Sequence, residues 1–399
     1  MNTLALPFRA FALAGAITLA PAAGVPDLPG VSETEIRIGN TLPYTGPAAA
    51  YGVLGRTLEA YFDMINAEGG INGRMVRFIS YDDGFSPPVA IEQVRRLVEQ
   101  DDVLLMFQQI GTEPNLAVRD YLNDAGVPQL FASSGSPLLD DPAAYPWTMR
   151  WNPSFQAEAA VYVRYITENF PGARVGILYR NDAAGAGYVA AMQAALPADT
   201  PILALPYDVA DTTVDAQISA FQADGVEVFL DFAIGTAASR AIARAAEVGW
   251  APHHILTSTS TGADILEAAG PGNAVGLVSA IFMKDPALPA WAGDPDITAY
   301  RAFLAEHHKE GEAAGLYALA AYSAAGTLVD ILRAAGDDLS RGNIMHLAAN
   351  LEDVAAAGLL PGVVLDTSPD DYAPIEQLQM ARFDGTAFVP FGPVIQGEP

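Results

Sequence analysis

Residues 103–107 read VLLMF, five apolar residues in a row without a charge. A continuous run of this kind predicts a strand covered on both faces, as in a parallel sheet. Residues 114–125 are typical of a helix that ends at Gly126, and residues 127–132 form a second apolar run. A strand, a helix and a strand in this order predict two parallel strands joined by a crossover helix.

The same alternation extends from this unit in both directions. Strands are predicted at 36–39 and 75–81, with a helix between them whose apolar residues recur at helical spacing. The pattern restarts after Pro153 and runs to about residue 257. Two such runs predict an α/β fold of two similar lobes, each built on a parallel sheet.

The last third of the chain has a different pattern. Helices are predicted at 297–308, 314–335 and 340–350. Near the end, Asp384-Gly385 separates two strand-like segments and therefore predicts a β-hairpin.

Length and composition limit the classes of function. A chain of 399 residues suggests two domains, and its 51% of apolar residues is enough to build full cores. With 47 acidic and 20 basic residues the formal net charge is −27, which argues against binding to nucleic acid or to anionic membrane surfaces. The chain has no cysteine, so disulfides and thiol chemistry are excluded.

The N-terminus predicts export. Arg9 precedes the apolar run 10–19, and the small residues Ala20-Pro21-Ala22 follow it. This pattern is typical of a secretory signal peptide, predicted at residues 1–22 with cleavage near Ala22, and it places the protein in the periplasm. A buried N-terminal helix is the alternative interpretation.

The sequence shows no signature of catalysis. It contains neither a Gly-x-Ser-x-Gly elbow nor a phosphate-binding loop. The histidine pairs His253-His254 and His307-His308 are adjacent in sequence, and adjacent side chains point in different directions, so neither pair readily shares a metal ion. We therefore expect no enzyme activity, no metal site and no cofactor.

Several motifs, taken in order, resemble a known family. They are EIRIG at 35–39, LPYTGP at 42–47, INAEGGING at 65–73 and GTEPNLAV at 111–118. In this order they resemble the leucine/isoleucine/valine-binding proteins, the solute receptors of ATP-binding-cassette (ABC) importers of the branched-chain amino-acid type. The resemblance extends over residues 35–393 and implies amino-acid transport or, as in one subgroup, uptake of aromatic carboxylates.

The resemblance implies a type I periplasmic binding fold. Two Rossmann-like lobes would be joined by a three-segment hinge near residues 150–152, 282–285 and 360–363. Lobe 1 would comprise residues 33–151 and 283–361, and lobe 2 residues 152–282 and 362–399. The ligand would bind between the lobes, at the carboxyl ends of the strands.

Four cleft segments are candidate ligand contacts. Backbone N–H groups at the start of a helix suit a carboxylate, which favours the loops at 109–112 and 133–136, although the second is also typical of a plain serine-rich turn. The resemblance implies an aromatic contact at 51 and another at 322, both of which have a core position as the alternative. The predicted site residues are Tyr51, Gln109, Ile110, Gly111, Thr112, Ser133, Ser134, Gly135, Ser136, Asp231, Thr259 and Tyr322.

The resemblance is weakest where relatives hold an amino group. Thr259 stands where amino-acid-binding relatives carry a glutamate, and Asp231 is a possible substitute. The expected ligand is a small organic acid, either an amino acid or an aromatic or keto acid.

The expected partners are that ligand and the permease subunits of an ABC importer. No nucleic acid is expected, and the protein itself is expected to be a monomer. A sensing or chemoreceptor-associated protein on the same fold is the alternative function.

Overall fold

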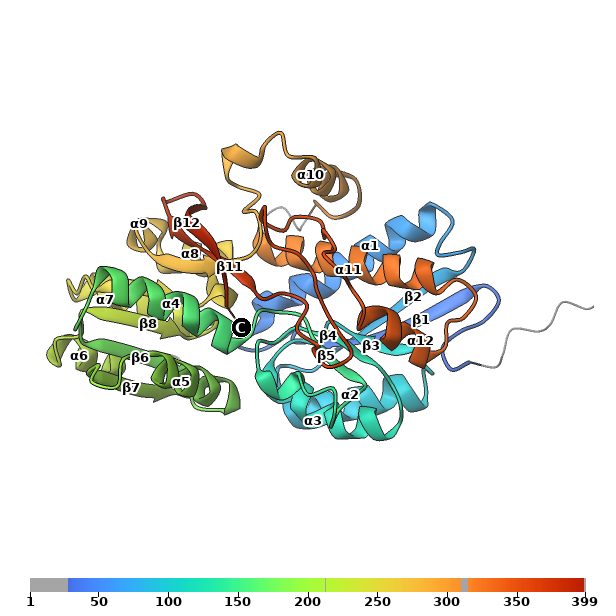
Figure 1. Cartoon of the computed structure of the whole chain (residues 1–399), viewed down its shortest axis with the longest axis horizontal. Coiled ribbons are helices and arrows are strands. Elements are labelled where there is room, and N and C mark those ends of the chain that lie inside the picture. Colours follow the sequence, from blue (N-terminus) through green and yellow to red (C-terminus); the bar gives the residue numbers. More distant parts are fainter. Residues whose placement is uncertain (1–27, 212, 310–314, 398–399) are drawn as a thin grey trace, which may run out of the picture.

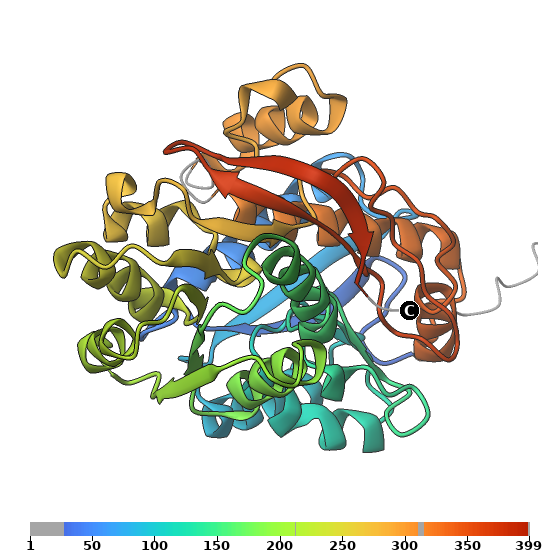
Figure 2. The same cartoon turned by 60° about the vertical axis from the view of Figure 1, so that its left-hand side comes forward.

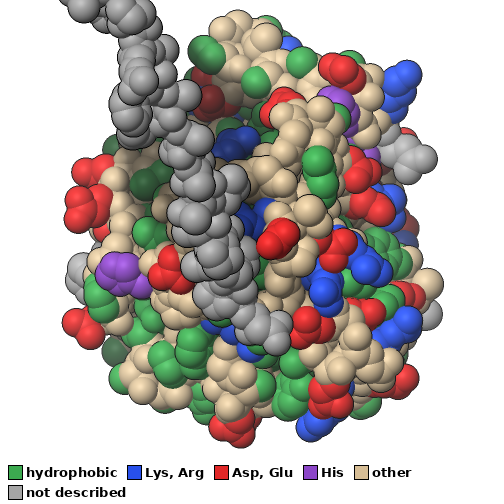
Figure 3. Space-filling model, turned by 90° about the vertical axis from the view of Figure 1, so that its right-hand side faces the viewer, with side chains coloured by type: hydrophobic (Ala, Val, Ile, Leu, Met, Phe, Trp, Pro, Cys, Tyr) green, Lys and Arg blue, Asp and Glu red, His purple; other side chains and the backbone are tan. Residues whose placement is uncertain are grey.

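The computed structural model describes residues 28–211, 213–309 and 315–397 (Figure 1). The predicted signal peptide lies outside the described residues and stays a prediction. Within the described part of the chain, no helix is long and apolar enough to cross a membrane. Acidic and basic side chains lie interspersed on the face seen in Figure 3.

The first sheet has five parallel strands in the order β2-β1-β3-β4-β5. Its central strands are buried, as the apolar run at 103–107 predicts. Its strands are β1 (Glu35–Leu42), β2 (Met75–Asp82), β3 (Leu105–Phe107), β4 (Gln129–Ala132) and β5 (Thr148–Arg150), and its helices are α1 (Gly52–Ala67), α2 (Pro87–Glu99) and α3 (Thr112–Asp124).

The second sheet has seven strands in the order β12-β11-β10-β9-β8-β6-β7. Five of them are parallel, and the hairpin of β11 and β12 adds the antiparallel edge that Asp384-Gly385 predicts. The strands are β6 (Val175–Arg180), β7 (Ile202–Tyr207), β8 (Val228–Phe232), β9 (His253–Leu256), β10 (Val278–Ile281), β11 (Gln377–Phe383) and β12 (Phe388–Gln396). The helices beside them are α4 (Phe155–Asn169), α5 (Ala183–Ala195), α6 (Asp215–Ala223), α7 (Gly235–Glu247), α8 (Ala263–Ala269) and α9 (Pro271–Ala274).

Three further helices lie between β10 and β11 in the sequence and return to the first lobe. They are α10 (Pro295–His307), α11 (Leu316–Ala335) and α12 (Arg341–Ala348). Both α10 and α11 contact α1, and α12 packs on α11. Figure 2 shows the β11–β12 hairpin crossing in front of the body after the chain has returned to the second lobe.

The chain therefore passes between the lobes three times. The first passage is held by the Trp151 N–H, which donates to the Ala132 carbonyl at 2.9 Å. The other two passages lie side by side, because the Leu360 N–H donates to the Phe282 carbonyl and the Lys284 N–H to the Gly358 carbonyl. The predicted two-lobed α/β class is confirmed, while the exact lobe boundaries stay a prediction.

Some predicted elements differ from the structure. The predicted strand 103–107 shortens to β3, Leu105–Phe107. The carbonyls of Val103 and Leu104 accept hydrogen bonds from the Arg341 guanidinium of α12, so a side chain occupies the acceptors that a neighbouring strand would use. The sequence pattern also missed β5, α8 and α9, which are only three, seven and four residues long.

Candidate functional site

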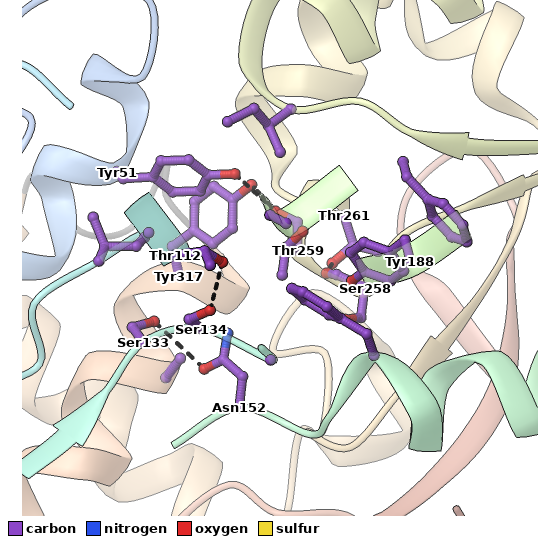
Figure 4. Close-up of a pocket in the computed structure, with 18 of the residues that line it drawn as sticks. Tyr51, Thr112, Ser133, Ser134, Asn152, Tyr188, Ser258, Thr259, Thr261 and Tyr317 are labelled. Carbon is purple, nitrogen blue, oxygen red and sulfur yellow. Dashed lines mark hydrogen bonds between the residues drawn. The ribbon is translucent and has the colours of Figure 1, made fainter. Parts of the chain in front are cut away.

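A cavity of about 130 Å³ lies between the two sheets, at the carboxyl ends of their strands. Figure 4 shows Thr112, Ser133 and Ser134 on one side of it and Tyr188 and Ser258 on the other. Its walls come from both lobes and from the passages between them. Its lining includes Tyr51, Phe85, Ile110, Gly111, Thr112, Ser133, Ser134, Gly135, Asn152, Phe155, Arg180, Gly185, Tyr188, Phe232, Ser258, Thr259 and Tyr317.

The structure brings most of the predicted site residues together. Eight of the twelve line this cavity, and they belong to all four predicted cleft segments. These eight are Tyr51, Ile110, Gly111, Thr112, Ser133, Ser134, Gly135 and Thr259.

The first-lobe wall combines hydroxyl groups with a helix start. Helix α3 begins at Thr112, and its first N–H groups have no partner within the helix. The Thr112 and Ser134 hydroxyls are 2.8 Å apart, and the Ser133 hydroxyl donates to Asn152 Oδ1 at 3.4 Å. Gly111 has a φ of +95°, and a Cβ there would overlap the ring of Phe85, so glycine is required before this helix. Such a wall suits a carboxylate.

The second-lobe wall is a column of aromatic rings. Tyr188 lies between Phe155 and Phe232, with ring centroids 4.0 and 4.1 Å away. Both neighbouring rings are stacked on it, and the column presents a largely apolar surface to the cavity.

A buried carboxylate anchors this column from behind. Glu158 on α4 accepts hydrogen bonds from the hydroxyls of Tyr162 and Tyr188, both at 2.5 Å, and from the Ser258 N–H at 2.6 Å. Burial raises the pKa of Glu158. Because its oxygens are occupied by these donors, Glu158 orients Tyr188 and the loop at 257–259 rather than facing the cavity.

Hydrogen bonds also join the lobes directly across the cavity. The hydroxyls of Tyr317 and Tyr51 both donate to the Thr259 carbonyl, at 2.8 and 3.3 Å. Burial raises the pKa of Tyr51 to about 12, so its hydroxyl stays protonated and able to donate. The Ala183 N–H of α5 donates to Glu113 Oε1 of α3 at 2.6 Å. The structure thus shows the lobes closed on each other.

Four predicted site residues do not line the cavity. Gln109 is buried and donates to the Thr41 hydroxyl, and Ser136 caps a short 3₁₀-helix. Asp231 is fully buried, where it accepts from the Ala233 N–H and pairs with His254 Nε2 at 3.2 Å. The suggestion that Asp231 replaces the missing ammonium partner is therefore corrected, because this carboxylate points into the second-lobe core.

Tyr322 is the fourth predicted site residue that does not line the cavity. The prediction is corrected because Tyr322 lies on a different face of α11 from the cavity. It packs among Tyr61, Tyr300 and Phe303, on the side of α11 that faces α1 and α10. Tyr317, five residues earlier on the same helix, reaches the cavity instead.

Sequence reasoning missed Phe155, Tyr188 and Arg180. Arg180 is the last residue of β6, so the rule that ligands meet the carboxyl ends of strands would have found it. Tyr188 and Phe155 lie on helices, where an aromatic residue gives no distinctive signal.

Comparison with known proteins places this geometry in a family. A family model described as periplasmic binding protein matches residues 35–387. The chain belongs to the periplasmic binding protein family. The resemblance to leucine/isoleucine/valine-binding proteins is thereby confirmed.

Among periplasmic binding proteins, a Leu/Ile/Val-binding protein of Rhizobium johnstonii is 28% identical over 169 residues. That alignment covers 42% of this chain and 46% of the relative, so the chain spans less than half the length of the curated relatives it matches.

Solved structures match over nearly the whole chain. A branched-chain amino acid ABC transporter protein of Thermus thermophilus with bound valine has a TM-score of 0.80 at 17% identity, covering 91% of this chain and 96% of that one. A solute binding protein of Rhodopseudomonas palustris in complex with 3,4-dihydroxybenzoic acid has a TM-score of 0.76 at 17% identity, covering 92% and 98%. These matches confirm the type I periplasmic binding fold.

Proposed function

We propose that this periplasmic binding protein captures a small organic acid between its lobes and delivers it to an ABC importer. The observation that carries the proposal is a cavity shared by both lobes, with a helix start and hydroxyl groups on one wall and an apolar aromatic column on the other. This combination suits a ligand with a carboxylate at one end and an apolar body at the other.

The ligand should be small. A cavity of about 130 Å³ is close in size to the roughly 150 Å³ cavity that holds one benzene molecule. A single aromatic ring or a short branched chain with a carboxylate fits this volume. Relatives of this fold crystallised with valine and with 3,4-dihydroxybenzoic acid carry ligands of this size class.

Binding and closure form one equilibrium in this proposal. A ligand that touches both walls favours the closed form over the open form, and the permease then recognises the closed form. The protein carries out no reaction and acts in the periplasm as a monomer, with the permease subunits as its partners.

A thermal-shift screen tests the proposed function. The panel contains leucine, its keto acid 4-methyl-2-oxopentanoate, benzoate, hydroxybenzoates and dicarboxylates. A ligand at 100 times its dissociation constant should stabilise the folded protein by about 2.7 kcal/mol. At least one monocarboxylate should raise the unfolding temperature in a concentration-dependent way; a panel without any shift would contradict the proposal.

The hydrogen bonds to Thr259 provide a second prediction. Tyr317→Phe removes the 2.8 Å bond between the lobes while keeping the ring, at a cost of about 1 kcal/mol to the closed form. The apparent affinity for the acid found in the screen should fall about fivefold in calorimetry. Tyr51→Phe, which removes a 3.3 Å bond, should have a smaller effect. Tyr322→Phe on the same helix is the control and should leave the affinity unchanged; an equal loss in all three variants would contradict the assignment.

A further inference from the structure

Arg180 has hydrogen-bonding capacity that the described protein does not use. It is the last residue of β6, its side chain is only 7% exposed, and it lines the cavity. Its Nε atom donates to Asp182, whose other oxygen caps α5 by accepting from the Gly185 N–H. The two terminal guanidinium nitrogens make no hydrogen bond to any described residue. A guanidinium has five N–H donors, so four remain for a ligand.

Within the part of the chain that the structure describes, the cavity lining contains no carboxylate that could pair with the terminal nitrogens of Arg180. It is the only charged side chain among the described lining residues. The carboxylates around the cavity are already engaged. Asp182 pairs with Arg180 Nε. Glu158 accepts from tyrosine hydroxyls, and Glu113 accepts from the Ala183 N–H. The described cavity lining therefore holds one cationic side chain and no carboxylate, while Asp182 pairs with that side chain through Nε alone.

Packing fixes where the guanidinium lies. The Cζ atom of Arg180 is 5.3 Å from the centroid of the Phe85 ring, and that same ring packs directly on Gly111 before α3. Through this shared ring, Arg180 of the second lobe lies near the N-terminus of α3 of the first lobe. Arg180, Gly111 and Thr112 line the same cavity, so an anion there that reached both groups would be held by the guanidinium of one lobe and by the helix start of the other.

We infer that Arg180 is the anion receptor of the cleft and selects carboxylates that carry no ammonium group. This inference rests on the proposed function and names its substrate class: monocarboxylates with an apolar body, such as aromatic acids and 2-oxo acids. A zwitterionic amino acid would bring an ammonium group into a cavity that already holds a guanidinium and has no acid, which is strongly unfavourable.

Calorimetry with four compounds tests the inference. Wild-type protein should bind benzoate or 4-methyl-2-oxopentanoate and should bind leucine and benzamide at least about 30-fold more weakly, as expected when one partner of a buried charge pair is lost. The comparison of benzoate with benzamide needs no substitution, so it stands even if a variant folds poorly.

Variants then connect this preference to one side chain. Arg180→Gln should weaken binding of the acids at least about 30-fold and leave the weak binding of benzamide nearly unchanged, which a merely structural role would not produce. Arg180→Lys should have an intermediate affinity for the acids, because lysine keeps the positive charge but lacks the planar guanidinium that can bind a carboxylate through two nitrogens. Arg174→Gln removes an exposed partner of Asp224 on the same lobe and is the matched control.

The outcomes separate this inference from the proposed function. Acid binding that survives in Arg180→Gln, or tighter binding of leucine than of its keto acid, would overturn the role of Arg180 and leave a solute-binding function standing. If wild-type protein bound none of the four compounds and no other carboxylate in the screen, the proposed function would fail and this inference with it.

Discussion

Glu158→Ala should lower the free energy of unfolding by about 3 kcal/mol. The substitution removes an acceptor shared by two buried donors, the hydroxyls of Tyr162 and Tyr188, and one half-buried donor, the N–H of Ser258. An unsatisfied buried donor costs about 1–3 kcal/mol, and the small alanine also leaves a cavity. Urea denaturation measures the change. Glu168→Gln, at an exposed position on the same helix, is the control and should change stability by less than about 0.5 kcal/mol.

The pH dependence of stability gives a second readout at Glu158. Burial raises its pKa in the folded state, so the folded protein holds this proton at pH values where the unfolded chain has lost it. The contribution to stability is complete below the ordinary glutamate pKa and is lost as the pH rises through the raised folded-state pKa. Glutamine does not titrate, so Glu158→Gln should not show this loss, and the difference in unfolding free energy between the variant and wild type should change with pH. A constant difference between the two proteins from pH 4 to pH 8 would contradict the placement of this carboxylate.

Gly185→Ala should destabilise the protein by about 3 kcal/mol and abolish acid binding. A Cβ at this position would overlap the backbone of Arg180, and a backbone cannot move aside as a flexible side chain can. The start of α5 must therefore shift, which carries the cost of overpacking and displaces both Asp182 and the guanidinium it orients. Urea denaturation and calorimetry with benzoate measure the two effects.

A second glycine serves as a control that distinguishes a steric clash of the new Cβ from the effect of alanine on helix propensity. Gly342 also lies in the first turn of a helix, but a Cβ there would meet nothing within 4 Å. Gly342→Ala should leave binding unchanged and stabilise the protein by up to about 1 kcal/mol, because alanine favours a helix more than glycine does. If Gly185→Ala behaved in the same way, the close packing of α5 on β6 would be wrong.

The fold could be predicted largely from local patterns. The apolar run at 103–107 and its repeats place most strands, and Asp384-Gly385 predicts the hairpin that closes the second sheet. What escaped prediction depends on contacts between distant segments. The start of β3 is set by Arg341, more than 230 residues away along the chain, and a window of sequence does not contain that contact.

The same distinction between local patterns and distant contacts applies to the candidate site. That residues 110–112 and 133–135 lie together at one cavity could be predicted, because parallel strands bring their carboxyl ends to one edge, while their contact with a ligand stays a prediction. The sequence did not predict which face of a helix points into the cavity. On α11 the residue that does so is Tyr317, whereas Tyr322 packs on Tyr61. Asp231 was misplaced because a residue at the end of a strand can point into either layer, and His254 holds it in the core.

Small-angle X-ray scattering with and without a bound acid tests the central claim most directly. The claim is that the cleft binds a small carboxylate and closes on it, and the structure has the closed form, with Tyr51 and Tyr317 of the first lobe bonded to the Thr259 carbonyl of the second. Protein refolded free of ligand should be more extended, and a saturating monocarboxylate from the screen should reduce its radius of gyration to that of the closed structure. Identical profiles with and without an acid that calorimetry shows to be bound would contradict the account.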